Sequence, residues 1–258
     1  MPLEALIFDV DGTLAETEEL HRQAFNETFA RFGLDWSWSR ELYRELLKVT
    51  GGKERMRHYV EAWRPQGGAE ALSRVAELHR EKTQRYTDLV AEGALKPRPG
   101  VLRLLHEARA AGVKLAIATT TSFANIEVLL KASFAPDALS WFAAIGAGDM
   151  VSAKKPAPDV YNLALKQLGC DPSTCIAFED SENGVRSARA AGLAVVVTPS
   201  VYTNGDDFSG AAWVLSDLGE ENVPFQQLAG NKLSGGTVAI TDLRGLSNGQ
   251  APTAASAT

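Results

Sequence analysis

The sequence predicts an α/β protein with a parallel sheet and an inserted helical domain. From residue 98 onward, apolar segments of strand length alternate with helices, which is typical of a parallel sheet covered by helices on both faces. A first strand stands near the N-terminus, at residues 5–8. Between this strand and residue 98 we find helical periodicity only, so we interpret residues 16–93 as the insert.

The insert contains four expected helices. Apolar residues recur every three or four positions in residues 17–32, 39–49, 53–63 and 69–91. Glycine or proline follows each of these segments within two residues, which marks the end of each helix.

The rest of the chain continues the alternation. Helices are predicted at residues 99–111, 122–131, 158–168 and 182–191, and strands at 113–118, 141–146, 174–178 and 194–198. We therefore assign residues 1–15 and 94–228 to the sheet domain. Residues 229–258 are rich in Gly, Ser, Ala and Thr, and we expect a partly disordered tail there, in which residues 238–240 have the composition of a short strand.

Composition and charge exclude several classes of partner for this protein. The chain has 258 residues, 45% of them apolar, and a formal charge of −6, which gives no basic surface for nucleic acid. No apolar run approaches the ~20 residues that span a bilayer. The first strand begins almost at once, which leaves no room for a signal peptide, and two isolated cysteines suit a reducing cytosol. We expect a cytoplasmic protein with no membrane partner, and a monomer.

Two carboxylates follow the first strand, in the sequence Asp9-Val-Asp11-Gly-Thr. Buried carboxylates are costly unless a cation is near, and ligands of open α/β sheets bind at the carboxyl ends of strands. A short D-x-D-G also begins many calcium loops. Here, however, Leu14 and Ala15 stand where further oxygen ligands should follow, which favours chemistry at the strand end.

Hydroxyl and lysine side chains follow two further strands. Thr119 and Thr120 precede a predicted helix, where they form either an anion site or a helix cap. Lys154 and Lys155 precede a proline and another helix. A lysine held rigidly there can contact a phosphate as a point charge, although most lysines are simply exposed. Spacing alone does not show which of these two lysines would make the contact.

A second pair of acids, Glu179 and Asp180, ends a later strand. Capping of the next helix would explain Asp180 but leaves Glu179 unexplained. Together, the four strand ends predict one site with a nucleophile, a phosphate cradle and a set of oxygen ligands. Oxygen ligands of this kind suit Mg²⁺.

These four motifs, in order across residues 9–184, resemble those of the haloacid-dehalogenase (HAD) superfamily. The helical insert after the first motif resembles the C1 cap of that superfamily, which implies a HAD-like Rossmannoid core with a cap. The sequences at residues 155–159 and 178–181 resemble the β-phosphoglucomutase-like branch, and residues 48–55 look most like the CbbY proteins. The genes of CbbY proteins accompany those of the Calvin cycle. The resemblance covers residues 3–220.

The resemblance implies a role for each core residue. Asp9 would attack phosphorus and carry an aspartyl-phosphate, and Asp11 would act as general acid and then as general base. Thr119, Thr120 and Lys155 would hold the transferring phosphoryl group. The implied Mg²⁺ ligands are Asp9, the backbone carbonyl of Asp11, Asp180, and Glu179 in or next to the coordination shell.

The cap is expected to select the substrate. Residues 50–55 combine a glycine turn at a helix start with two cations, which suits a second phosphate group. Lys82 is expected to reach the same site, and Glu18 and His21 to line its mouth, although each cation could also be an ordinary solvated side chain. The predicted substrate-binding residues are Glu18, His21, Thr50, Gly51, Gly52, Lys53, Arg55, Lys82, Thr119, Thr120 and Lys155.

The function that the resemblance implies is a Mg²⁺-dependent phosphatase for a small sugar bisphosphate. CbbY-type enzymes remove the C1 phosphate of xylulose 1,5-bisphosphate, an inhibitor of Rubisco, and leave xylulose 5-phosphate. The alternatives are a β-phosphoglucomutase, a phosphatase of another sugar phosphate, and a catalytically idle binding protein of the same fold. Glu16 stands where the mutase has an aspartate, which argues against the mutase.

Overall fold

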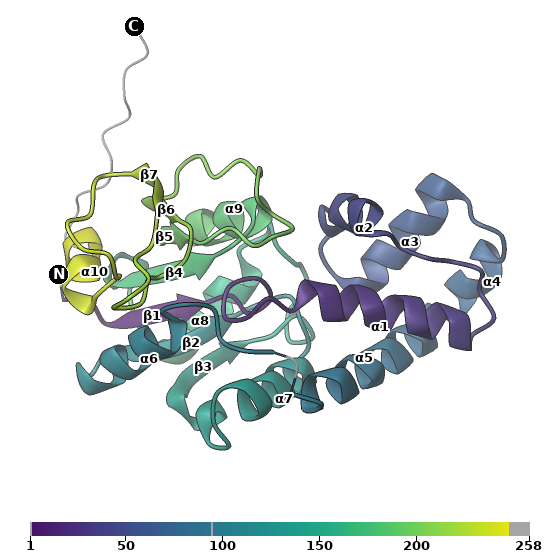
Figure 1. Ribbon diagram of the computed structural model, residues 1–258, viewed down its shortest axis with the longest axis horizontal. Coiled ribbons are helices and arrows are strands. Elements are labelled where there is room, and N and C mark those ends of the chain that lie inside the picture. Colours follow the sequence, from purple (N-terminus) through teal and green to yellow (C-terminus); the bar gives the residue numbers. More distant parts are fainter. Residues whose placement is uncertain (1, 94, 248–258) are drawn as a thin grey trace, which may run out of the picture.

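The computed structural model describes residues 2–93 and 95–247 and confirms the α/β fold. In the described part, seven strands form one sheet in the order β3-β2-β1-β4-β5-β6-β7 (Figure 1). Strands β1 to β6 run parallel, and β7 runs antiparallel to β6. The strands are β1 Ala5–Phe8, β2 Lys114–Ala118, β3 Phe142–Gly146, β4 Cys175–Glu179, β5 Ala194–Val197, β6 Trp213–Leu215 and β7 Gln227–Gly230.

Helices cover both faces of the sheet, as continuous apolar strands require. Leu6 and Phe8 of the central strand β1 pack with helices α6, α7 and α10, whereas Ala5 and Ile7 pack on the opposite face with α8 and α9. All four residues of β1 are 0% exposed, so this strand is the centre of the core. The covering helices are α6 Val101–Ala110, α7 Phe123–Ser133, α8 Asp159–Leu168, α9 Glu182–Ala190 and α10 Ile240–Ser247.

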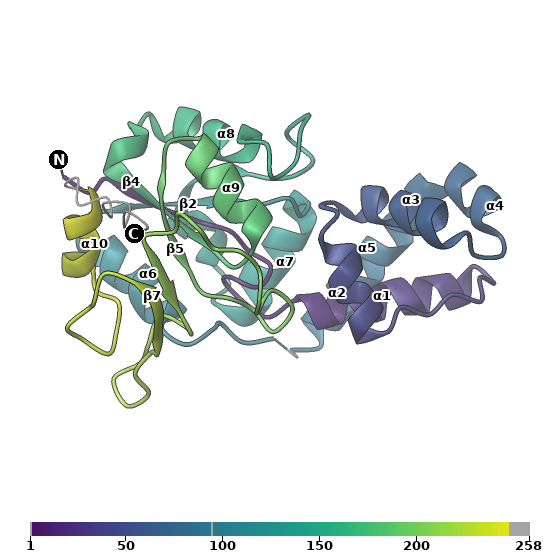
Figure 2. The ribbon, with the colours of Figure 1, turned by 90° about the horizontal axis from the view of Figure 1, so that it is seen from above.

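Five helices, which we call the cap, lie together at one end of the molecule (Figures 1 and 2). They are α1 Glu18–Arg31, α2 Arg40–Leu47, α3 Gly52–Trp63, α4 Gly68–Ser73 and α5 Val75–Ala91. Aromatic side chains such as Phe25, Phe29 and Trp38 give the cap a hydrophobic cluster of its own. The domain boundaries at residues 16 and 93 stay a prediction.

Hydrogen bonds join the rim of the cap to the core. Asn183 Nδ2 donates to Thr50 Oγ1 at 3.3 Å, and the Tyr202 hydroxyl donates to Glu19 Oε2 at 2.5 Å. Arg44 Nη2 donates to the carbonyl that precedes Tyr202, at 3.1 Å. The ring of Tyr202 also enters the aromatic cluster of the cap. The structure therefore shows the cap closed against the core.

The long helix predicted at residues 69–91 is wrong in one respect, because it is two helices separated at Arg74. Arg74 has φ −109° and ψ 13°, and Ser73 Oγ donates to the Glu70 carbonyl at 2.7 Å. A serine hydroxyl that bonds a helix carbonyl competes with the helical hydrogen bonds. The apolar spacing continues across the break, so periodicity alone did not reveal it.

The region after residue 210 differs more from the prediction. Strands β6 and β7 were missed because three or four residues are too few to show a period. Residues 238–240 are not a strand: α10 begins at Ile240, whose N–H donates to Glu107 Oε1 at 2.9 Å. Residues 229–247 include packed side chains, since Val238 and Leu243 are 0% exposed. The end of the tail that we expect to be mobile, residues 247–258, lies outside the described residues from 248 onward.

Two smaller observations concern the described residues. Cys170 and Cys175 are both free thiols, and Cys175 is buried. No described helix combines the length and the apolar character that a membrane crossing needs.

Candidate active site

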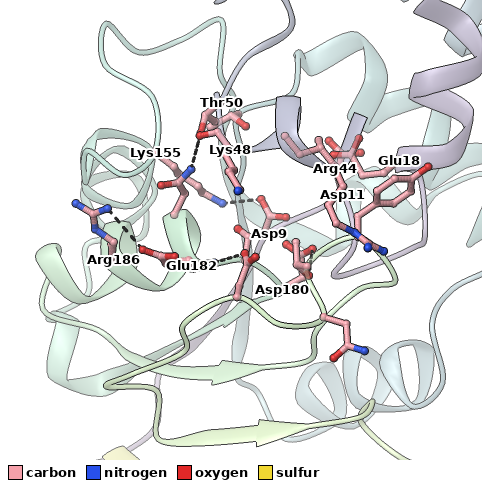
Figure 3. A pocket seen from close by; sticks show the side chains of 18 of the residues that line it. Asp9, Asp11, Glu18, Arg44, Lys48, Thr50, Lys155, Asp180, Glu182 and Arg186 are labelled. Carbon is pink, nitrogen blue, oxygen red and sulfur yellow. Dashed lines mark hydrogen bonds and ion pairs between the residues drawn. The ribbon is translucent and has the colours of Figure 1, made fainter. Parts of the chain in front are cut away.

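The polar strand ends meet where the strand order changes direction. Strand β1 lies between β2 and β4, and the chain passes from β3 at one edge back to β4 beside β1, which creates a crevice at their carboxyl ends. A cavity of about 540 Å³ lies there, between the core and the cap. Figure 3 shows Asp9, Asp11 and Asp180 on the core side of this cavity and Arg44, Lys48 and Thr50 on the cap side.

Lys155 is the lysine that reaches the acids. Its Nζ donates to Asp9 Oδ1 and to Glu179 Oε1, each at 2.6 Å, and the Tyr161 hydroxyl donates to the same Glu179 oxygen at 2.5 Å. Lys154 instead donates to a backbone carbonyl, so the structure separates the two lysines. Burial raises the pKa of Asp9 to about 7; Lys155 opposes this shift, and the nearby carboxylates add to it.

Asp180 is free for the site because a neighbour caps the helix. Ser181 is the N-cap of α9, and its Oγ accepts from Gly184 N–H at 3.2 Å. The hydroxyl of Thr203 donates to Asp180 Oδ2 at 3.1 Å. Gly12, with φ +82°, packs directly against the same carboxylate, where any side chain would overlap it. Burial, followed by Asp9 and Glu179, raises the pKa of Asp180.

The acids fit a divalent cation. One carboxylate oxygen each from Asp9, Glu179 and Asp180 lies within 4.8 Å of the others, and all three residues are buried. Lys155 is the cation bonded to this group, so a second positive charge would favour the ionised carboxylates. An oxygen-only donor set suits a hard cation. The acids come from two strand ends, those of β1 and β4, which is unlike a calcium loop.

Asp11 ends a chain of hydrogen bonds from the cap. Lys82 Nζ lies 2.6 Å from His21 Nδ1, and His21 Nε2 lies 3.2 Å from Asp11 Oδ1. A charged Lys82 can only donate, so Nδ1 accepts from it. Nε2 then carries the ring proton and donates a hydrogen bond to Asp11 Oδ1. Burial alone would raise the pKa of Asp11, but His21 and a hydrogen bond from Thr17 outweigh it and lower the pKa to about 2. Burial lowers the pKa of Lys82 to about 7.

A second cavity, of about 370 Å³, lies on the other side of residues 50–55. Its lining contains the cations Lys53, Arg55, Lys82 and Lys154 and the acids Asp11, Glu18, Glu54 and Asp149. The remaining lining residues are His21, Gly51, Gly52, His79, Thr120, Thr121, Ser122, Asn125, Gly148 and Val151, and the cavity shares Asp11, Glu18, Arg55 and Thr120 with the first cavity. Ser122 Oγ and Asn125 Oδ1 are buried without a hydrogen-bond partner. The Ser122 hydroxyl can donate to an anion, whereas the Asn125 oxygen can only accept, and Asp149 already accepts from Phe123 N–H at the start of α7 at 3.4 Å. The four cations and the Ser122 hydroxyl are therefore the groups of this cavity that can bind an anion.

Arg55 forms part of the wall between the two cavities. It is not a solvated cap charge, because it is 8% exposed and its Nη1 donates to the Tyr43 hydroxyl at 2.9 Å. Tyr43 in turn donates to Glu18 Oε2 at 2.8 Å. These bonds connect α1, α2 and α3 around the position where the two cavities meet.

The predicted residues therefore gather around these two cavities. Glu179 is the exception, since it is 0% exposed and lies beneath Lys155. The sequence reasoning missed Arg44 and Lys48, which line the first cavity. Their spacing of one helical turn just before Thr50 is a signal that could have revealed them. Thr203 does not directly follow a strand, so its position in the sequence did not indicate a site residue.

Gly184 provides a test of the packing beneath the site. A methyl group at this position would overlap the Glu179 carboxylate, so Gly184→Ala should destabilise the fold by about 1–3 kcal/mol and lower its Tm by several degrees. Gly245→Ala is a matched control, because this helical glycine has nothing within 4 Å of the added Cβ. Equal melting temperatures for the two variants would show that Glu179 has room to move.

A carboxylate beside a buried cation, under a cap that shields it, is suited to attack on a phosphate ester. The fold and the site thus define a phosphoric monoester hydrolase of the α/β class. The chain belongs to the haloacid dehalogenase-like hydrolase family, which matches residues 3–192.

Similar proteins indicate to which branch of this family the chain is related. The chain is 58% identical to the protein CbbY of Rhodobacter capsulatus over 218 residues, or 84% of this chain and 95% of the relative. A crystal structure of CbbY from Rhodobacter sphaeroides with phosphate gives a TM-score of 0.79 at 52% identity, covering 83% of this chain and 94% of that one. A mutant of CbbY from the same organism was crystallised with xylulose 1,5-bisphosphate, with the same TM-score and coverage. The chain is a CbbY-like HAD phosphatase.

Proposed function

We propose that this chain is a Mg²⁺-dependent phosphatase that hydrolyses the C1 phosphate of xylulose 1,5-bisphosphate and releases xylulose 5-phosphate. The observation that carries the proposal is the pair of adjoining cavities, one with the acids and Lys155, the other with four cations and the unpaired Ser122 hydroxyl. Two phosphate groups on one sugar match two such cavities. The bisphosphate bound to a CbbY relative supports this sugar.

In the first step, a carboxylate oxygen of Asp9 forms a bond to phosphorus, and the bond between phosphorus and the C1 oxygen breaks. Asp11 gives its proton to that leaving oxygen. The negative phosphate raises the pKa of Asp11 from its low value in the free site, which favours the acid form. Lys155 and the end of β2, at Thr119 and Thr120, hold the phosphoryl oxygens.

In the second step, Asp11 accepts a proton from water as the water oxygen bonds to phosphorus, and the bond to Asp9 breaks. Inorganic phosphate leaves, and both aspartates return to their starting states. The His21 contact favours ionised Asp11, which suits this base role. Asp9, Asp180 and the Asp11 carbonyl would hold the cation, with Glu179 beside it. Bound magnesium supplies positive charge that offsets repulsion between Asp9 and the phosphate.

The second phosphate is assigned to the cavity of residues 50–55. Lys53 lines it from the cap, whereas Thr121 and Ser122 line it from the start of α7. The cations Lys53, Lys82 and Lys154, with the Ser122 hydroxyl, favour a dianion there. This places the sugar across the wall formed by Arg55 and Glu18.

A phosphate-release screen tests the function. The protein with Mg²⁺ is offered xylulose 1,5-bisphosphate, other sugar mono- and bisphosphates, and β-glucose 1-phosphate with its bisphosphate activator. We expect stoichiometric phosphate from xylulose 1,5-bisphosphate and the highest kcat/KM for it. Isomerised glucose phosphate without phosphate release would instead identify a mutase.

Lys53→Ala tests whether the second cavity binds the distal phosphate without taking part in the reaction at Asp9. Loss of one charged hydrogen-bond partner should cost about 1.5–3 kcal/mol, or roughly ten- to more than a hundredfold in kcat/KM, for the bisphosphate. Turnover of p-nitrophenyl phosphate, which lacks the second phosphate, should change little. Arg57→Ala is the control, because Arg57 is an exposed cation one turn further along α3.

Two outcomes would contradict this assignment. Equal losses with both substrates would mean that Lys53 serves cap closure. No loss with either substrate would remove the second cavity from the proposal.

A further inference from the structure

Arg98 is a buried arginine that the proposed mechanism does not use. It lies where the chain returns from the cap to the core, between α5 and α6, and it is 9% exposed. Its backbone N–H donates to the Leu14 carbonyl at 2.9 Å, and Ala15 pairs with Pro97, so the two linkers cross as a short antiparallel bridge. Neither of the cavities that border the site is lined by Arg98.

The guanidinium of Arg98 binds backbone carbonyls from three loops. Nη1 donates to the Gly12 carbonyl and, at 2.7 Å, to the Thr198 carbonyl. Nη2 donates to the Pro199 carbonyl at 2.8 Å and to the Ser216 carbonyl at 3.2 Å. These acceptors follow β1, β5 and β6, so one side chain connects loops at the carboxyl ends of three strands.

The contacts require an arginine. A guanidinium presents five N–H donors in a fixed plane on three nitrogens, whereas the three donors of a lysine sit on a single nitrogen, which cannot reach all of these carbonyls at once. Nε of Arg98 lies 3.4 Å from Glu16 Oε1, which supplies the opposite charge. A buried cation is tolerated only when it is paired and hydrogen-bonded in this way.

Two of the loops that Arg98 holds contact the Asp180 carboxylate. Gly12 packs against its Oδ2 so closely that no side chain would fit between them. The loop after β5 reaches the same oxygen: Ser200 N–H donates to Thr203 Oγ1 at 2.9 Å, and Thr203 Oγ1 donates to Asp180 Oδ2 at 3.1 Å. Movement of either loop would therefore change the surroundings of this carboxylate.

We propose that Arg98 is a positioning residue for Asp180, and through Asp180 for the divalent cation. The inference rests on the proposed function, since it assumes that Asp180 holds a metal. Arg98 touches neither the cation site nor the substrate cavities, and it acts by fixing the two loops that contact the carboxylate. Residues that orient a metal ligand typically change metal affinity or activity by roughly 10- to 100-fold when they are mutated.

Arg98→Lys tests this directly, because the charge remains while the planar donor set is lost. Mn²⁺ binding to the protein without substrate is titrated by electron paramagnetic resonance, and we expect affinity to fall by about 10-fold or more. The kcat for p-nitrophenyl phosphate and for the bisphosphate should fall alike, and excess Mg²⁺ should restore part of the loss.

Arg103→Lys is the matched control. Arg103 on α6 also donates to backbone carbonyls, those of Leu218, Gly219 and Val238, but these lie away from the site. Its replacement should lower Tm without changing Mn²⁺ affinity. If Arg98→Lys changes Mn²⁺ affinity no more than Arg103→Lys does, Arg98 supports the fold alone and the proposal is overturned.

A second variant covers the case in which Arg98→Lys does not fold. Thr203→Val removes the hydroxyl between the loop after β5 and Asp180 and leaves Arg98 intact. We expect weaker Mn²⁺ binding in this single variant. Where Arg98→Lys does fold, the losses should not be additive when both substitutions are combined. Unchanged Mn²⁺ affinity in Thr203→Val would show that this loop does not position Asp180.

The metal site itself is tested separately. If the wild-type protein binds no Mn²⁺, or Asp180→Asn binds it as tightly as wild type, the proposed metal site fails. If Asp180→Asn weakens binding but the Arg98 and Thr203 variants do not, the metal site stands and the role of Arg98 is wrong.

Discussion

Asp9→Asn is expected to reduce phosphate release by roughly 10⁴-fold or more, for the bisphosphate and for p-nitrophenyl phosphate alike. The amide keeps the shape of the side chain but cannot attack phosphorus as an anion. The fold should persist, because the substitution removes one of the carboxylates that crowd Glu179 and Asp180, and Lys155 keeps its bond to Glu179. Phosphate release and thermal melting are measured on the same sample.

Asp35→Asn is a suitable control for this change, because Asp35 is exposed at the far end of the cap and should leave the rate unchanged. A well-folded Asp9→Asn protein that keeps a tenth of the wild-type rate would rule out Asp9 as the nucleophile.

Removal of the cation should have the next largest effect. Excess EDTA is expected to abolish phosphate release, and added Mg²⁺ to restore it. Without the cation, the negative phosphoryl group is repelled by three buried carboxylates, to which Lys155 is the bonded cation. Asp180→Asn should lower kcat by roughly 100-fold or more and raise the Mg²⁺ concentration needed for half-maximal rate.

Asp207→Asn provides the comparison, since Asp207 is an exposed acid in the loop after β5. It should require no more Mg²⁺ than the wild type. Full activity in excess chelator would remove magnesium from the mechanism, whatever the Asp180 variant does.

Much of the core and its site could be predicted because local signals coincide with topology there. Strand β1 is entirely apolar and is followed by Asp9, and Thr119, Lys155 and Asp180 lie in segments that follow β2, β3 and β4. In a parallel sheet the carboxyl ends of strands lie at one edge, so residues far apart in sequence must meet. That argument needs only the strand assignments, and it brought Asp9, Thr119, Lys155 and Asp180 together.

The contacts that support the site could not be predicted in the same way. Tyr161 lies on the buried face of α8, where its spacing matches any core residue, and only its hydroxyl contact with Glu179 distinguishes it. Arg98 precedes Pro99 and Gly100, which read only as a helix start. Its partners lie up to 118 positions away, so no local pattern indicates them.

Short elements also escaped prediction for a physical reason. Strand β6 has three residues, and its pairing with β5 decides its conformation more than its own sequence does. Helix α10 starts with β-branched residues that favour strands, but side-chain acceptors on Glu107 and Asp242 satisfy its first N–H groups.

The hydrogen bonds at the rim of the cap also determine how often the cap opens away from the core. Asn183, Tyr202 and Arg44 contribute four hydrogen bonds there, and a typical bond of this kind adds only about 0.5–1.5 kcal/mol net. Breaking these four bonds therefore costs a few kcal/mol, to which the packing of the Tyr202 ring adds, so we expect the open conformer to be a minor state. Ligands can enter and leave through this conformer, without any unfolding of the core. Loosening the rim would speed product exit and at the same time let water reach the acids more often.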